Sequence, residues 1–136
     1  MSSNRKYRIL IVEDSTISSY IVKRLVRASG FFEEPAIRED GRSALKYLEG
    51  AQRNHRFPDV IILDIQMPGM DGIEFLEWYE KDFYENYPKT KIFIFSIENP
   101  SETQSKILRF NAVDSFISKY QDGSFLTTLL QRLALQ

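Results

Sequence analysis

The chain has 136 residues, 43% of them hydrophobic and 27% charged, with a formal net charge of −1. This length favours a single domain over residues 1–136, with a core spanning about residues 6–133. Cysteine is absent, which excludes disulfides, thiolate catalysis and thiolate metal sites.

Charge and hydropathy also limit the classes of molecule that we expect as partners. There is no basic surplus of the kind that marks a nucleic-acid-binding module. No apolar run approaches the roughly 20 residues that span a bilayer, and the basic N-terminus does not continue into a signal-peptide cleavage site. We therefore expect a cytoplasmic protein whose partners are proteins, with no nucleic-acid or membrane partner.

Strand-like and helix-like segments alternate along the first part of the chain. Apolar, β-branched runs indicate strands, and apolar residues at helical spacing indicate helices. In chain order, the predicted elements are a strand over residues 7–12, a helix that carries Ile17, Ile21, Val22, Leu25 and Val26 and ends at Gly30, a short strand over residues 36–39, and a helix after Asp40-Gly41.

The same alternation continues to the C-terminus. The apolar run over residues 59–65 predicts a strand buried on both faces, as parallel strands are. After it come a loop over residues 67–72, a helix over 73–83, a strand over 92–95, a helix that starts at Asn99-Pro100 and carries Ile107, Leu108 and Phe110, a strand over 113–118, and a last helix capped by Asp122 or Ser124.

Five strands joined by helical crossovers lie parallel, and right-handed connections place helices on both faces of the sheet. The predicted fold is a doubly wound α/β domain, which binds ligands at the carboxyl ends of its strands.

Polar residues stand at that edge. Glu13 and Asp14 follow the first strand, Asp64 ends the third, Ser96 ends the fourth and Lys119 follows the fifth. Three clustered carboxylates repel one another, so they favour a bound cation, and an all-oxygen donor set suits Mg²⁺. Lys119 offers a second positive charge and Ser96 a hydroxyl group.

These residues lie in motifs that resemble those of response regulator receiver domains. The segment 63–72, Leu-Asp-Ile-Gln-Met-Pro-Gly-Met-Asp-Gly, is similar to the family's phosphoacceptor signature. Residues 11–15, 95–96 and 116–119 resemble its acidic, hydroxyl and aromatic-lysine motifs. The resemblance covers about residues 6–133 and implies a CheY-like, flavodoxin-like sheet with strand order 2-1-3-4-5.

The resemblance also implies a reaction. Asp64 would accept a phosphoryl group from a sensor histidine kinase or a histidine phosphotransfer protein. Asp14, Asp64 and the backbone carbonyl of Gln66 would bind Mg²⁺, and Glu13 would act through a bound water. Such a domain catalyses its own phosphorylation and dephosphorylation and is not a conventional turnover enzyme.

Signalling in the family follows from the same contacts. Lys119 would neutralise the phosphoryl oxygens and Ser96 would donate a hydrogen bond to one of them. Phe116 would then turn inward and alter the face made by the fourth helix, fifth strand and fifth helix. An unknown downstream protein, or a second copy of the chain in a phosphorylation-dependent homodimer, would bind that face.

The sequence departs from the family pattern at several positions. Tyr120 follows the lysine where proline is usual, and Ile97 is bulkier than the small residue usually found after the hydroxyl residue. Phe116 replaces the usual tyrosine and can act only by packing. Gln66 and Glu98 occupy positions that tune the phosphoryl lifetime in the family.

Other functions compete with this one. A haloacid-dehalogenase-like phosphatase needs a second aspartate two residues after its nucleophile, where this chain has Gln66. A pseudo-receiver, which docks partners without phosphorylation, stays open because of Ile97 and Tyr120. Taken alone, Glu13-Asp14 would more often be a helix cap, and the ordered set of motifs favours the receiver.

Two further features have simple interpretations. His55 lies in a polar stretch and is expected in a solvated loop. The aromatic residues around Trp78 and Tyr79 favour a packing cluster, with a partner surface as the alternative. Few residues follow the last predicted helix, so we expect a stand-alone receiver without an effector domain.

Overall fold

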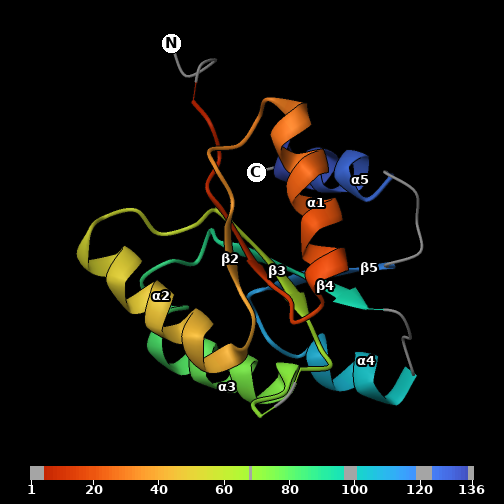
Figure 1. Ribbon diagram of the computed structural model, residues 1–136. Coiled ribbons are helices and arrows are strands. Elements are labelled where there is room, and N and C mark those ends of the chain that lie inside the picture. The colour runs from red at the N-terminus through yellow and green to blue at the C-terminus, as the bar shows by residue number, and fades with distance from the viewer. Residues whose placement is uncertain (1–4, 68, 97–100, 119–123, 135–136) are drawn as a thin grey trace.

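A computed structural model describes residues 5–67, 69–96, 101–118 and 124–134. Five parallel strands form one sheet in the order β2-β1-β3-β4-β5, as the resemblance implied (Figure 1). The strands are β1 (Ile9–Val12), β2 (Ala36–Arg38), β3 (Val60–Asp64), β4 (Lys91–Ser96) and β5 (Val113–Ser118). The helices are α1 (Thr16–Ser29), α2 (Gly41–Arg53), α3 (Gly72–Asp82), α4 (Ser101–Ile107) and α5 (Ser124–Ala134).

Helices cover both faces of the sheet, so the predicted doubly wound architecture is confirmed. Successive strand residues point to opposite faces. In β1, Leu10 and Val12 pack with residues of α2, α3 and α4, whereas Ile9 and Ile11 pack with residues of α1 and α5. Both clusters are almost fully buried. Within the described residues, no helix is long and apolar enough to cross a membrane.

Several predicted boundaries shift. The first strand is shorter than expected, and Tyr7 forms only an isolated parallel bridge with Phe32. The fourth helix ends at Ile107, so Leu108 and Phe110 lie in the following turn and not on the helix as predicted. Leu108 is exposed and Phe110 packs against the core. The predicted helix start at 99–100 and the predicted cap Asp122 lie outside the described residues.

Polar caps start three helices just beyond strand ends. The Ser15 hydroxyl accepts a hydrogen bond from the Ser18 N–H at the start of α1, and the Asp40 and Asp71 carboxylates do the same for α2 and α3. The backbone N–H of Ser43 holds the pKa of the Asp40 carboxyl below its ordinary value. These caps fix the helix N-termini at the carboxyl edge of the sheet.

The apolar stripe predicted for α1 divides into two parts. Val22 and Val26 are buried against the sheet, as their spacing indicated. Ile17 and Ile21 are 74% and 51% exposed. Helical spacing alone does not say how wide a stripe the sheet covers, and here the sheet covers the face of Ser19, Val22 and Val26, with Ile17 and Ile21 to one side of it.

The aromatic residues of the α3 region form the predicted packing cluster. Phe57 stacks on Tyr87 with ring centroids 3.7 Å apart, and both Tyr79 and Phe83 contact Phe57. Tyr79 is fully buried, and burial raises the pKa of its phenol. Trp78, by contrast, is 43% exposed.

A close backbone approach at Gly72 gives a first prediction. A Cβ atom at Gly72 would lie 2.8 Å from the Ile65 Cα. Because that contact is with backbone, Gly72→Ala should lower the free energy of unfolding by about 1–3 kcal/mol, measured by urea denaturation. Gly50→Ala is the matched control, since its Cβ would have no neighbour closer than 3.9 Å. That control should be neutral or stabilising by up to about 1 kcal/mol. Equal stability of the Gly72 variant and the wild type would contradict the prediction.

Candidate functional site

Three carboxylates meet at the carboxyl edge of the sheet. Glu13 and Asp14 follow β1, and Asp64 is the last residue of the neighbouring β3. The two strands pair in parallel with Val12 opposite Leu63, so the residues that follow these two lie side by side at the edge of the sheet. Ligand oxygens of the three acids lie within 4.8 Å of one another. The predicted gathering of these residues is therefore confirmed.

The three acids differ in their surroundings. Glu13 and Asp64 are buried, with only 2% and 4% of their surfaces exposed, whereas Asp14 is exposed. The Ser15 N–H donates to Glu13 Oε2 at 3.0 Å, and the Gln66 N–H donates to Asp64 Oδ1 at 3.1 Å. These backbone donors hold each buried carboxylate in one orientation, while Asp14 keeps the cluster open to solvent.

The donor set fits Mg²⁺. Two unit charges about 4 Å apart repel by about 4 kcal/mol at an effective dielectric of 20. A divalent cation removes that repulsion, and hard carboxylate oxygens with access to water are the ligands that Mg²⁺ prefers. Among the described residues, this is the cluster of acidic groups with the geometry of a metal site.

The loop after β3 packs against the end of that strand, next to Asp64. Gly72 donates its N–H to the Ile65 carbonyl at 2.9 Å, which closes the loop onto the end of β3. Gly69 adopts a φ of +79°, a left-handed conformation that glycine takes without strain. Met67 and Met70, which belong to this loop, are buried. The signature segment thus positions Asp64 by bringing the start of α3 against the strand.

The remaining predicted site residues are only partly described. Ser96 ends β4 and pairs in register with Ser118 of β5, so its backbone lies at the same edge as Asp64. Its side chain lies outside what the structure describes, as do Lys119 and the departures Ile97, Glu98 and Tyr120. Phe116 is half-buried and packs against the cluster on the α2 and α3 face.

Sequence reasoning missed two supports of the acidic pair. The N–H of Glu13 donates to the Arg38 carbonyl at 3.0 Å, so β2 fixes the backbone of the site. Ser15 both caps α1 and donates to Glu13. The position of Ser15, directly after the acidic pair and before an apolar run at helical spacing, indicates such a cap. The Arg38 contact depends on strand register and had no local sign.

Comparison with known proteins gives a consistent result. The family model described as the response regulator receiver domain matches residues 9–131. The polar-differentiation response regulator DivK of Brucella ovis is 30% identical over 112 residues, which cover 82% of each chain. The transcriptional regulatory protein DegU of Brevibacillus brevis is 28% identical over 97% of this chain. This chain matches only 52% of DegU, so it spans about half of that relative's length.

Solved structures support the same fold. A two-component response regulator from Cytophaga hutchinsonii superposes with a TM-score of 0.87 at 24% identity, over 97% of this chain and 100% of that one. Chemotaxis protein CheY4 of Vibrio cholerae gives a TM-score of 0.77 at 29% identity, over 95% of this chain and 99% of that one.

Metal binding at the cluster can be tested by stability. A ligand that binds only the folded state raises the free energy of unfolding by about 2.7 kcal/mol when its concentration is a hundredfold above its dissociation constant. We expect Mg²⁺ to raise the wild-type melting temperature through such an increment, and Asp14→Asn to reduce it. In EDTA the variant should be at least as stable as the wild type, because one repelling charge is gone. Glu49→Gln, an exposed acid on α2, is the control and should keep the full increment. An undiminished increment in Asp14→Asn would contradict the assignment.

Proposed function

Since this chain belongs to the response regulator receiver domain family, we propose that it accepts a phosphoryl group on Asp64 and thereby switches a protein-binding surface. We further propose that it acts in the cytoplasm as a stand-alone receiver in a phosphorelay. The observation that supports this most directly is that Glu13 and Asp14 lie beside the buried carboxylate of Asp64, the proposed acceptor.

Asp64 is the nucleophile of the proposed reaction. Its carboxylate oxygen attacks the phosphorus of a phosphohistidine and forms an acyl phosphate on Asp64. The N–P bond breaks, and the donor's imidazole is the leaving group. The Gln66 N–H donates to Asp64 Oδ1 and so orients the carboxylate. Asp14, Asp64 and the Gln66 carbonyl would hold Mg²⁺, and Glu13 would do so through a water. When bound, the ion neutralises charge on the phosphoryl oxygens.

Three other residues complete the proposal. Lys119 supplies a fixed positive charge for the phosphoryl oxygens, and the Ser96 hydroxyl donates a hydrogen bond to one of them. The pairing of Ser96 with Ser118 supports this, because it brings the end of β4 beside the strand end that Lys119 follows. Phe116 is only half-buried on β5, so part of its ring surface is still available for burial in the proposed switch.

The output follows from the added charge. A phosphoryl group brings nearly two negative charges and three strong acceptors to the end of β3. The contacts it makes with Ser96 favour one of two arrangements of the loop after β4 and of Phe116. The face formed by α4, β5 and α5 would then bind a downstream protein, for which a second copy of the chain is one candidate.

The phosphodonor is proposed to dock on α1. This helix starts directly after the acidic pair, and its first two turns expose Ile17, Tyr20 and Ile21 at 74%, 57% and 51%. Exposed apolar residues grouped at the rim of a reactive site mark a surface that a protein covers. A sensor histidine kinase or histidine phosphotransfer protein docked there would bring its phosphohistidine to Asp64.

Phosphorylation of Asp64 is tested by intact mass. With Mg²⁺ and acetyl phosphate, the wild type should gain one phosphoryl group and Asp64→Asn none, because the amide is not a nucleophile. Lys119→Ala should greatly reduce the yield. Beryllofluoride and a phosphohistidine donor extend the test to a crowded acceptor. If all three reagents leave the wild type unchanged, phosphotransfer is wrong and the chain is a pseudo-receiver that docks partners without phosphorylation.

The docking surface is tested separately from the chemistry. Ile17→Glu or Ile21→Glu should slow transfer from phosphorylated histidine phosphotransfer proteins by about tenfold or more, the effect of losing a central apolar contact. Labelling by acetyl phosphate should stay unchanged, because that donor needs no protein surface. Phe31→Glu is the matched control, since Phe31 is 54% exposed but lies beyond the other end of α1. Equal slowing with both donors would show damage to the site and would contradict a docking role.

A further inference from the structure

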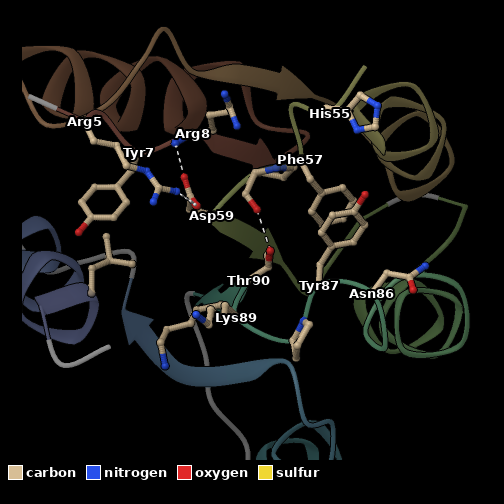
Figure 2. A pocket seen from close by; sticks show the side chains of 14 residues that line it. Arg5, Tyr7, Arg8, His55, Phe57, Asp59, Asn86, Tyr87, Lys89 and Thr90 are labelled. Carbon is tan, nitrogen blue, oxygen red and sulfur yellow. Dashed lines mark hydrogen bonds and ion pairs between the residues drawn. The ribbon is translucent and has the colours of Figure 1, made fainter. Parts of the chain in front are cut away.

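A cleft lies at the edge of the sheet opposite the carboxylates. It has a volume of about 1000 Å³. Its walls come from the segment before β1, the α2–β3 loop and the α3–β4 loop, which all precede strands (Figure 2). In a parallel sheet these segments share the amino-terminal edge, so the cleft is separate from the phosphoacceptor site.

Cations dominate the lining. Arg5, Arg8, Lys89 and Lys91 line the cleft, and Asp59 is the single carboxylate among the described lining residues. This surplus contrasts with the chain's net charge of −1 and with the acidic opposite edge. The charged groups of the lining are therefore mostly basic, which favours an anionic ligand.

The carboxylate of Asp59 is already engaged. Its Oδ1 accepts a hydrogen bond from the Arg5 guanidinium at 3.1 Å, and its Oδ2 accepts one from the Arg8 N–H at 2.9 Å (Figure 2). Asp59 thus serves to hold the segment before β1 in place. The guanidinium has five N–H donors, so Arg5 keeps several for a ligand.

Lys89 is the cation with the greatest freedom to bind. Lys91 pairs with Asp114 at 3.2 Å, and Arg8 faces Glu33 at 3.6 Å. Lys89 is exposed and makes no ion pair with any residue that the structure describes. Lys89 belongs to the α3–β4 loop, and its ammonium carries three donors (Figure 2).

Aromatic rings line the cleft beside these donors. Phe57 and Tyr87 are stacked with an interplanar angle of 6°, and Tyr7 lies on the opposite side, next to Arg5 (Figure 2). Phe57 is nearly buried, so the stack is a rigid wall and not a loose side chain. Ligand sites of this size commonly combine such apolar walls with a few convergent polar groups.

We propose that this cleft binds a small organic anion that carries a planar ring. Lys89 and Arg5 would bind its phosphate or carboxylate by charge-assisted hydrogen bonds, and Tyr7 and the Phe57–Tyr87 wall would contact its ring. The binding requires neither Mg²⁺ nor phosphorylation of Asp64. The proposal therefore stands or falls independently of the proposed phosphotransfer.

The experiment titrates the full chain with AMP, 4-hydroxybenzoate, adenosine and hexaglutamate, and follows backbone amide shifts by NMR. AMP or 4-hydroxybenzoate should shift amides of the three cleft segments, and salt should weaken the binding. Lys89→Glu should weaken it by about tenfold or more, the usual effect of losing a charge-assisted hydrogen bond. Lys81→Glu, which changes an exposed lysine on α3, is the matched control and should bind as the wild type does.

Each outcome has a definite meaning. Binding of AMP alone assigns a phosphate ester, and binding of 4-hydroxybenzoate alone assigns an aromatic carboxylate. Adenosine binding as tightly as AMP would overturn the role of the anion. Hexaglutamate as the single ligand would replace the proposal with docking of an acidic protein segment. No shift in the cleft with any compound, or equal affinity in Lys89→Glu, would overturn it. The dispersed amide spectrum of ligand-free Lys89→Glu, compared with that of the wild type, checks that the variant is folded.

Discussion

The candidate site depends on one constraint, the parallel pairing of β1 with β3. That pairing forces Glu13 and Asp14 to leave the sheet beside Asp64, and it brings three carboxylates within 4.8 Å. Their repulsion costs free energy that folding must supply elsewhere, chiefly through the buried strands. The continuous apolar character of β1 and β3 supports this, since every residue of both strands is buried. The hydrophobic core thus maintains an electrostatically unfavourable cluster ready for a cation.

The fold was predictable because its signals are local. Alternating apolar strands and periodic helices require parallel crossovers, and crossovers place all strand ends at one edge. The acidic cluster followed from that edge without any knowledge of side-chain contacts. Exposure of Ile17 and Ile21 was not predictable, because periodicity shows that a helix is amphipathic but not how wide a face the sheet covers. The end of α4 at Ile107 was missed because Leu108 and Phe110 continue an apolar pattern into a turn.

Contacts between residues that are far apart in the sequence could not be predicted either. Asp114 on β5 has a side chain only 7% exposed and pairs with Lys91 of β4 at 3.2 Å and Arg132 of α5 at 2.7 Å. Burial alone would raise the pKa of the Asp114 carboxyl, but hydrogen bonds from Arg132 and Lys91 hold it below its ordinary value. A lowered pKa means that Asp114 stabilises the fold at neutral pH and loses this effect only in acid. The pairs tie β5 to both neighbours beside the proposed output face.

The two edges of the sheet carry opposite charge, and that separation gives the fold two independent sites. Carboxylates at the strand ends suit a metal ion and the phosphoryl group it would neutralise. Cations at the strand starts, with Lys89 free of ion pairs among the described residues, suit an anion. Both edges are linked by the same strands, so β3 begins beside Asp59 and ends at Asp64. A ligand in the cleft could influence phosphotransfer only if it bound the two switch arrangements with different affinities, because equal affinity shifts no equilibrium.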